Sequence, residues 1–449
     1  MRYEEYKQTN VFWLPEIPAA WEWLLLSQTA KEQCIKKPQG AAFNVMSLSY
    51  GSVIRKRNID AGLVPANYDN YQVIQAGNII LRLTDLQNDH TSLRTGLVKE
   101  DGIITSAYTC LAPTENSAYL QYLLYAYDIR KIFYGMGGGV RQSIGYKDIR
   151  NMRIPVPPLE EQDQIVRYLD WQVSKITKLI TAKKKQIALL NEHRSVVLNT
   201  VVTRGLKSNR PLKRSGMKWL PQIPADWETI PAKALFSCMH DLRQESDEMM
   251  AATQKYGIIA QKKYMELEGR RIVLANDSLD KWLHVEPNDF IISLRSFQGG
   301  LEKCTETGCV TWHYVVLRPN SDVFPEFYRW FFKSSSYISA LQHTSDFIRD
   351  GQDLRYSNFV KVRLLKIPLQ EQVEISKYLE QTIPKYDNSI AGKEKEIAYL
   401  HELRTRLISD VVTGQINVRN VVIPEYESVE EDMSEDEFTD DELEISEVE

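Results

Sequence analysis

The sequence has few features of a secreted, membrane-bound or disulfide-stabilised protein. Its 449 residues include only five cysteines and no Cys-x-x-Cys pair, so we expect reduced thiols. Its uncharged apolar runs are far shorter than the roughly 18 residues that a membrane-spanning helix needs, and its first residues lack the pattern of a signal peptide. We therefore expect a soluble, cytoplasmic protein without a membrane partner, with room for two or three domains.

Sequence motifs of common catalytic sites are also missing. There is no Gly-x-Ser-x-Gly elbow, no His-Glu-x-x-His helix and no Asn/Asp-Pro-Pro-Tyr/Phe motif. A glycine-rich stretch at residues 135–139 lacks the last glycine of a dinucleotide fingerprint and the Gly-Lys-Ser/Thr ending of a phosphate loop. We interpret it as a loop, and we expect no catalytic residues in this chain.

Charge is distributed unevenly. The net charge is -5, but residues 421–449 hold fourteen Asp and Glu and no Lys or Arg, which leaves a net charge of +9 for residues 1–420. A like-charge run with few aromatic residues is usually disordered. Three functions remain open for this acidic tail: it could solubilise the protein, contact a basic partner, or act as a DNA-like competitor for the basic face of its own chain.

One long stretch organises the rest of the chain. It begins with Pro-Pro-Leu-Glu-Glu-Gln at residues 157–162 and continues without Pro or Gly to Gly205. Its apolar residues step by alternating fours and threes, which is a heptad pattern that predicts a helix of about 65 Å with one face against a partner helix. The positions on this face, apolar except for Lys183 and Arg194, are Leu169, Val173, Ile176, Ile180, Lys183, Ile187, Leu190, Arg194, Val197 and Val201.

The partner helix is in the same chain, because the pattern recurs 210 residues later. Leu-Glu-Glu-Gln at residues 159–162 becomes Leu-Gln-Glu-Gln at residues 369–372, and Val-Val-Thr ends both copies. Only the second copy contains a proline, Pro384, which predicts a kink or a separation of the first two turns. Even the polar exceptions recur, as Lys393 and Arg404. The apolar positions that we expect to pair in the second copy are Leu379, Ile390, Ile397, Leu400 and Leu407.

Each predicted helix follows a similar domain, which reads as mostly strands with few helices. The motif Trp-Leu-Pro-x-Ile-Pro-x-x-Trp at residues 13–21 returns at residues 219–227 and predicts an extended arm that packs flat on its domain. The complete domain prediction is a first strand-rich domain at residues 1–155, a central helix at 156–206, a linker at 207–217, a second strand-rich domain at 218–366, a distal helix at 367–414 and a disordered acidic tail at 415–449.

The repeat argues against a metal site. Cys304, Cys309 and His313 have a zinc-like spacing. The repeat, however, aligns Cys309 and His313 with Ile103 and Ala107, which are ordinary strand positions. We expect neither a metal nor a cofactor to be bound by this chain.

Basic and amide side chains recur at matching places in the two domains. Lys and Arg neutralise DNA phosphates, Arg reads guanine, and Asn or Gln reads adenine. A solvated surface is the alternative for any one cluster, but recurrence favours DNA binding. The candidates are Arg55, Lys56, Arg57, Arg82, Gln87, Arg141, Gln142, Tyr146 and Lys147 in the first domain, and Gln261, Lys262, Lys263, Arg295, Gln298, Gln352, Arg355 and Tyr356 in the second.

With these motifs assembled, the chain resembles the DNA-specificity subunits of Type I restriction-modification systems. The resemblance covers about residues 8 to 415. It rests on the arm, on a Tyr-Gly-x-Val/Ile turn, and on Pro-Leu-x-Glu-Gln leading into a helix that ends in Val-Val-Thr. It implies an α+β fold with two similar target-recognition domains, each followed by a long helix, and with the helices in an antiparallel coiled coil of pseudo-twofold symmetry.

The resemblance also implies a function. Such a subunit is not catalytic; it reads a bipartite, asymmetric DNA sequence from the major groove, and its helix pair sets the spacer. Two methyltransferase subunits would dock on it and modify adenines with S-adenosylmethionine, and motor-nuclease subunits would join them for restriction. The alternative is a stand-alone sequence-specific DNA-binding protein or regulator without methyltransferase partners.

Overall fold

The computed structural model describes residues 2–38, 43–49, 51–56, 68, 70–84, 86, 94–136, 144–253, 255–269, 279–293, 296, 300–344 and 354–429. These form two compact units. The first unit combines residues 1–184 with residues 394–449, and the second unit consists of residues 185–393. No helix in the described part of the chain is long and apolar enough to cross a bilayer.

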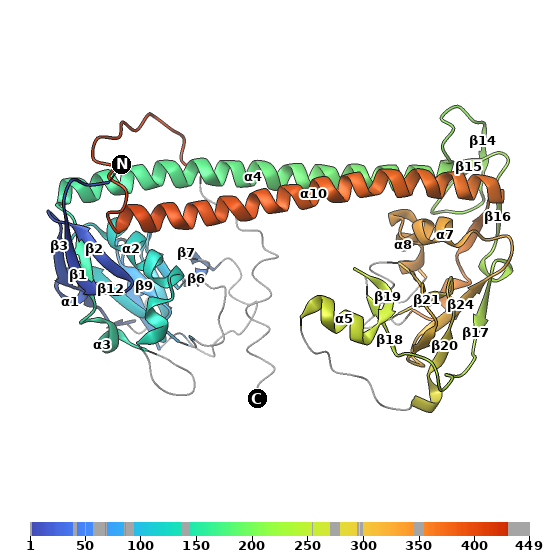
Figure 1. The fold of residues 1–449 in the computed structure, drawn as a ribbon, viewed down its shortest axis with the longest axis horizontal. Helices are drawn as coiled ribbons and strands as arrows, with labels where there is room; N and C mark the ends of the chain where they lie inside the picture. The colour runs from blue at the N-terminus through green and yellow to red at the C-terminus, as the bar shows by residue number, and fades with distance from the viewer. Residues whose placement is uncertain are drawn as a thin grey trace. The chain divides into compact units, whose positions relative to one another are not determined.

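Two long helices, α4 (Leu159–Arg204) and α10 (Leu369–Val412), form where the heptads predict them (Figure 1). Each follows a proline and has an acidic residue in its first turn, where the helix dipole favours negative charge. After α4, Gly205 has a φ of 75°, and after α10, Gly414 has a φ of 74°, a left-handed conformation that glycine adopts without strain. Helix α10 continues through Pro384, so its first two turns do not separate from the rest.

The two helices contact each other within each unit. In the first unit Lys183 of α4 forms an ion pair with Glu396 of α10. In the second unit Arg194 Nε of α4 lies 2.8 Å from Asp387 Oδ1 of α10. The predicted heptad positions differ in burial. Leu169, Ile176, Ile180 and Leu379 are buried. The other predicted positions are half-buried, namely Ile187, Leu190, Ile390, Ile397, Leu400 and Leu407.

The domain of the first unit is rich in strands. Its largest sheet has the order β4 (Ala30–Glu32), β12 (Thr109–Pro113), β9 (Ile79–Leu81), β10 (Thr95–Leu97), β7 (Ser52–Arg55) and β6 (Met46–Ser49). A second sheet has the order β11 (Gly102–Thr105), β8 (Tyr71–Ile74) and β5 (Ile35–Lys36). Two antiparallel pairs are β1 (Tyr6–Val11) with β2 (Leu14–Pro18), and β3 (Glu22–Leu25) with β13 (Arg153–Val156). The short helices are α1 (Leu26–Thr29), α2 (Ser117–Ile129), the 3₁₀ helix η1 (Ile132–Gly135) and α3 (Tyr146–Ile149).

The domain of the second unit repeats much of this plan. Its largest sheet has the order β17 (Phe236–Met239), β24 (Val315–Pro319), β21 (Phe290–Ile292) and β22 (Glu302–Lys303). Further antiparallel pairs are β14 (Leu212–Arg214) with β15 (Gln222–Pro224), β16 (Glu228–Pro231) with β25 (Arg363–Lys366), β18 (Met250–Thr253) with β19 (Gly257–Ala260), and β20 (Leu283–Val285) with β23 (Gly308–Val310). The helical segments are η2 (Ala232–Ala234), α5 (Gln261–Glu268), η3 (Leu279–Lys281), α7 (Pro325–Phe332), α8 (Ser335–Gln342) and α9 (Tyr356–Phe359).

The repeat begins earlier than the sequence comparison suggested. Strand β14 lies inside the stretch predicted as a linker, and it pairs with β15 as β1 pairs with β2. Leu212 faces Pro224 in the β14–β15 pair. In the β1–β2 pair the corresponding residues, Tyr6 and Pro18, lie 206 positions earlier and face each other in the same way. The tryptophans that end the arms, Trp21 and Trp227, do not lie flat on a surface; both are fully buried. The arms are thus part of the domain cores.

Each core encloses the ends of both long helices. The first contains Ile165 and Leu169 from the start of α4 together with Val411 and Val412 from the end of α10. The second core contains Leu198, Val201 and Val202 from the end of α4. They pack with Ile375, Leu379 and Ile383 from the first half of α10. Burying these apolar side chains fixes each domain to two helix ends.

Candidate nucleic-acid interface

The first basic cluster lies at the end of strand β7. Arg55 is opposite Met46 in the β6–β7 pair, and its side chain is exposed. Lys56 is half-buried, and its backbone N–H donates to Val45 at 2.9 Å. The edge pairing of β7 with β6 therefore holds this cluster at the rim of the six-stranded sheet, where Arg55 can meet a phosphate.

The second basic cluster differs from its predicted equivalent. Strand β19 leads directly into helix α5, so residues 261–263 form a helical turn rather than a strand end. Gln261 is only 8 % exposed, and its side-chain amide lies 3.4 Å from the carbonyl oxygen of Met250. At this exposure Gln261 is a weaker candidate for reading a base than the exposed lysines that follow it. Lys262 and Lys263 are exposed, at 3.8 and 3.9 Å from the carboxylates of Glu248 and Glu306, respectively.

Tyr146 and Tyr356 occupy equivalent places, as the first residues of the short helices α3 and α9. Both are half-buried. The hydroxyl of Tyr146 donates to the Ala30 carbonyl at 3.0 Å, while the ring of Tyr356 stacks on Phe359. The Tyr146 bond ties α3 to the first domain core, and α9 is held in the second core by the buried ring of Phe359. The neighbouring Lys147 and Arg355 are exposed and are the better candidates for DNA contact.

A buried arginine that the sequence did not single out supports the segment after β9. Arg94 is completely buried, and its guanidinium donates to the carbonyl oxygens of Thr84 at 2.7 Å and Arg82 at 3.1 Å. Its backbone N–H donates to Asp128 Oδ2 at 2.7 Å. Arg82, a predicted DNA contact, is half-buried, and Arg94 holds its backbone. One arginine among many carries no sequence signal for such a role.

Several predicted contacts lie outside the described residues. They are Arg57, Gln87, Arg141, Gln142, Arg295, Gln298 and Gln352.

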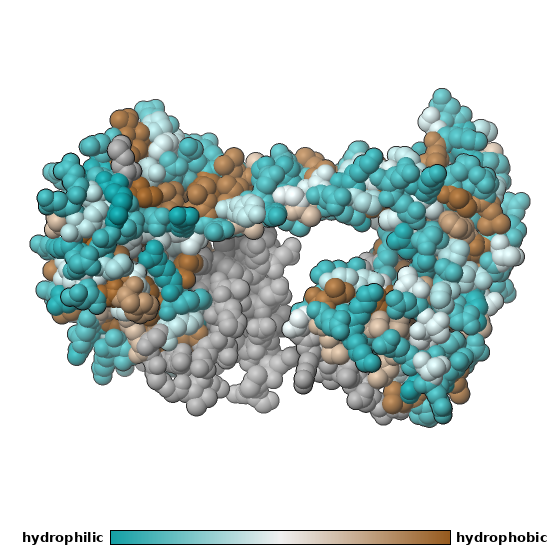
Figure 2. Space-filling model, in the orientation of Figure 1, coloured by the Kyte–Doolittle hydropathy of each residue, from teal (hydrophilic) through white to brown (hydrophobic). Residues whose placement is uncertain are grey.

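The surface of the second unit is mainly polar on the side shown in Figure 2. Hydrophilic side chains cover most of this face, and hydrophobic ones form small separate patches (Figure 2). Scattered apolar side chains are normal for a protein surface. The described residues also include no group of three or more His, Cys, Asp or Glu side chains arranged to hold a metal ion.

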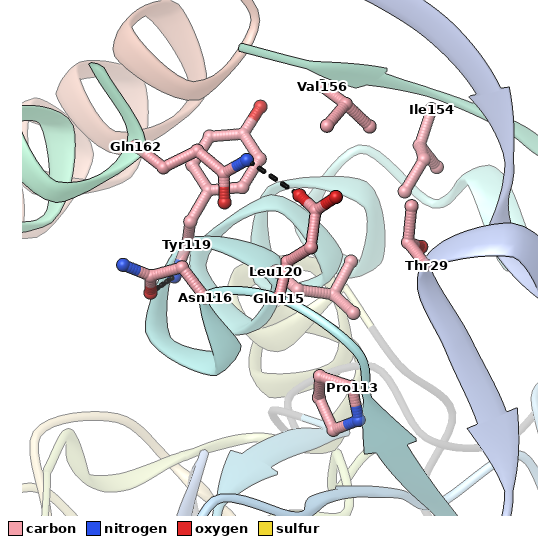
Figure 3. Close-up of a pocket in the computed structure, with 9 residues that line it drawn as sticks. All are labelled: Thr29, Pro113, Glu115, Asn116, Tyr119, Leu120, Ile154, Val156 and Gln162. Carbon is pink, nitrogen blue, oxygen red and sulfur yellow. Dashed lines mark hydrogen bonds between the residues drawn. The ribbon is translucent and has the colours of Figure 1, made fainter. Parts of the chain in front are cut away.

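A small cavity marks the joint between the first domain and α4. Gln162 points toward Glu115 and donates to its carboxylate at 2.9 Å, while Tyr119 lies beside them (Figure 3). The hydroxyl of Tyr119 is within hydrogen-bond distance of the Pro155 and Val412 carbonyls, and burial holds its pKa well above the ordinary value. The cavity volume of about 10 Å³ leaves room for no more than a water molecule. This place is a structural joint and not a ligand pocket.

The second domain has the equivalent joint. The Gln372 side chain donates to the Ile367 carbonyl at 2.7 Å, as Gln162 donates to Pro157 at 2.9 Å. Tyr328 takes the place of Tyr119, and its hydroxyl donates to Leu365. The recurrent Leu-x-Glu-Gln motif is thus explained, because its glutamine anchors each long helix to the domain before it.

This architecture defines a class of protein: two strand-rich domains of related plan, each fixed to the ends of two long helices. Comparisons with known proteins agree. Residues 65–189 match the model of the Type I restriction modification DNA specificity domain. Two specificity subunits of Methanocaldococcus jannaschii are similar along most of the chain. The putative MjaX subunit is 24% identical over 320 residues, covering 69% of this chain and 71% of that protein. The MjaVIII subunit is 23% identical over 366 residues, covering 78% and 82%.

A solved structure has the same fold. It comes from work on complex assembly and conformational transition of the type I R-M system, has a TM-score of 0.65 and 14% identity, and covers 89% of this chain and 99% of its own. The matched region and the two relatives make the chain similar to the specificity subunits of Type I restriction-modification systems.

Proposed function

We propose that this chain reads a bipartite, asymmetric DNA sequence, with one half-site for each domain. The observation that carries the proposal is the equivalent joint in the two units, where the Gln162 amide donates to Glu115 and the Gln372 amide donates to the Asp322 carbonyl, so that each glutamine anchors a long helix to a strand-rich domain. Exposed Arg55 and Lys147 in the first domain, and Lys262 and Arg355 in the second, would contact phosphates or base edges in the major groove.

The two half-sites should differ in sequence. In the first domain, strand β7 ends at Arg55, whereas β19 continues into helix α5 with its own lysines. The domains therefore present different groups at matching places of the repeat. Because base recognition depends on the placement of individual donors and acceptors, different groups imply different bases.

The long helices would fix the distance between half-sites. We propose that α4 and α10 pair as an antiparallel coiled coil with pseudo-twofold symmetry. The Lys183–Glu396 and Arg194–Asp387 contacts support this arrangement, and so do the half-buried heptad positions. Helices of this length, on the order of 65 Å, would separate the half-sites by about one to two turns of DNA, each roughly 34 Å.

The proposed partners rest on the similarity to specificity subunits. The relatives are specificity subunits of type I restriction enzymes. We propose that two methyltransferase subunits dock on this chain and bring S-adenosylmethionine, which this chain does not bind itself. Motor-nuclease subunits would join them for restriction.

Mapping modified bases tests the proposal. The chain would be co-expressed with any Type I methyltransferase subunit encoded beside it, and methylated adenines would be mapped across the host DNA, with the methyltransferase alone as the control. We expect methylation in a split motif, two short halves around a fixed gap, only when both proteins are present. A contiguous motif, or the same pattern without this chain, would contradict the proposal.

A further inference from the structure

The C-terminal strap, residues 421–429, lies along α4 within the first unit. The side-chain amide of Gln164 donates to the carbonyl oxygens of Val418 and Val421, at 3.1 and 2.8 Å. Ten residues further along α4, the Ser174 hydroxyl donates to the Glu427 carbonyl at 3.2 Å and accepts the backbone N–H of Val429 at 2.9 Å. The strap therefore runs in the same direction as α4.

The strap has a defined position on the helix. Ser174 is only 3 % exposed, and the Lys178 ammonium lies 3.5 Å from the Glu427 carboxylate. Ordered chain thus extends well beyond residue 415, where the sequence predicted the disordered tail to begin. The last described residue, Val429, is fixed against α4 by its backbone.

The sequence beyond the strap is strongly acidic. Residues 430–449 contain twelve Asp and Glu and no Lys or Arg, and they lie outside the described residues. We propose that this acidic tail binds the basic DNA-contacting residues of the first domain and competes with DNA for them. The inference rests on the proposed DNA-binding function and adds a regulation of that same surface.

Chain length permits this contact. Twenty residues can span at most about 65 Å when extended, and a domain of about 150 residues has a radius of gyration of roughly 15 Å. A tail that starts at Val429 can therefore reach the surface of the first domain that carries Arg55 and Lys147. Tethering gives such a segment an effective concentration of about a millimolar, so that weak ionic contacts suffice for occupancy.

The strap distinguishes this function from the alternatives that the sequence left open. A solubilising tail does not need a fixed starting point, and a tail that reaches for a separate basic partner does not gain from being held against its own domain. An anchored tail instead keeps its carboxylates near the same basic residues at all times. Carboxylates would substitute for phosphates there, and salt would weaken both contacts.

The expected result of this competition is a lower occupancy of unrelated DNA at a given protein concentration. DNA of unrelated sequence is bound almost only through its phosphates, whereas the target adds contacts to its bases. Each DNA must displace the tail completely from the phosphate-binding residues. The tail therefore lowers the affinity for unrelated DNA and for the target by the same factor. Weakly bound unrelated DNA then falls below the concentration needed for occupancy, and the tightly bound target stays above it.

A tail deletion and a matched full-length variant test the competition. The first chain ends at Val429 and keeps the strap; the second retains residues 430–449 with all twelve Asp and Glu changed to Asn and Gln. At low salt both should bind a duplex of unrelated sequence about tenfold more tightly than the natural chain, and the difference should shrink as salt rises. Equal affinities of all three chains for DNA would overturn the inference.

Carbodiimide crosslinking then separates a direct contact from general charge repulsion. This reagent joins a carboxylate to a lysine only when the two touch. We expect crosslinks from residues 430–449 to lysines of the first domain, such as Lys147, that disappear when DNA is added. The strap contact between Glu427 and Lys178 provides an internal control, because it should persist. Tail crosslinks that are absent, or that DNA does not remove, would overturn the inference.

The outcomes also distinguish this inference from the proposed function. Tight DNA binding by all three chains with equal affinity would reject the tail contact and leave DNA recognition intact. Absence of DNA binding by every chain, alone and with the methyltransferase, would reject the proposed function and the competition together.

Discussion

Arg210 and Glu371 form a largely buried ion pair that joins the chain just after α4 to the first turn of α10. Their side chains are 9 % and 17 % exposed. The indole N–H of Trp227 donates to the other carboxylate oxygen of Glu371 at 2.8 Å. In the first unit Arg419 Nε lies 3.9 Å from Glu161 in the first turn of α4. Both arginines stand five residues after the glycine that ends a long helix, so the structural repeat extends beyond the helices.

Removing the arginine should destabilise the second unit. Arg210→Ala leaves the Glu371 carboxylate buried without its cation, which costs about 3 kcal/mol at a site of this kind. We expect a lower urea midpoint for the unfolding of this unit, measured by tryptophan fluorescence.

Arg419→Ala is the matched control. Its side chain is 46 % exposed and its carboxylate partner is more distant, so its loss should cost less than about 1 kcal/mol. Equal losses of stability for the two substitutions would contradict a special contribution of the Arg210–Glu371 ion pair to the second unit.

Gly205 should tolerate a methyl group poorly. Its φ of 75° favours glycine, and a Cβ there would lie 2.6 Å from Arg210 Nη1 and 2.7 Å from Glu371 Oε1. Gly216→Ala is the control, because Gly216 has a φ of 79° with open space around its Cα. The control should lose about 1 kcal/mol from backbone strain alone. Gly205→Ala should lose at least about 1 kcal/mol more, and similar urea midpoints for the two variants would contradict this view.

The sequence predicted the long helices well because their signals are local. Heptad spacing, a proline before the first turn and a glycine after the last are all read from neighbouring residues. The strand order of the six-stranded sheet depends on pairings between distant segments, such as β12 with β4, and had no comparable signal. Analogy between repeats also misled: residues 261–268 have the composition of a helix, and Gly269 ends it at a φ of 65°.

The candidate site was less predictable than the fold. Residue type and recurrence suggested which side chains could meet DNA, but they carry no information on exposure. Gln261 is buried and Arg55 is exposed, although both stand at the end of a Tyr-Gly strand motif. Arg94 and Arg210 support the structure through contacts with residues far away in the sequence. Such contacts become visible only after the chain has folded.

The packed face of α4 can be tested with two adjacent residues. Ile180 is 1 % exposed and Leu179 is 50 % exposed. Ile180→Asp would bury a carboxylate among apolar side chains and should destabilise the first unit by about 3 kcal/mol or more. Leu179→Asp changes the same helix turn but faces solvent, and it should cost less than about 1 kcal/mol. A similar loss in both urea midpoints would argue against burial of this heptad face.

Thiol reactivity should follow burial. Burial raises the pKa of Cys304 and Cys309 to about 11 and that of Cys110 to about 12. At pH 8 a thiol of pKa 11 is only ~0.1% thiolate, the reactive form. Iodoacetamide should therefore modify exposed Cys34 first, as followed by mass spectrometry, and the three buried thiols should react faster as the pH rises. Labelling of Cys110 at the rate of Cys34 at pH 8 would contradict the buried position.

The exposed cations of the first domain should determine how DNA binding depends on salt. Each phosphate contact that is lost lowers the slope of log K against log salt by about 0.9, so the double variant Arg55→Gln with Lys147→Gln should lower it by about 2. Gln261→Ala is the contrasting variant. Because Gln261 is buried, this change should reduce stability and leave the slope of the folded protein unaltered. Both slopes would be measured on an unrelated duplex with the tail-neutralised chain, so that the tail does not contribute its own salt dependence. An unchanged slope for the double variant would mean that Arg55 and Lys147 are solvated side chains, and DNA contact would then have to be sought at other basic residues.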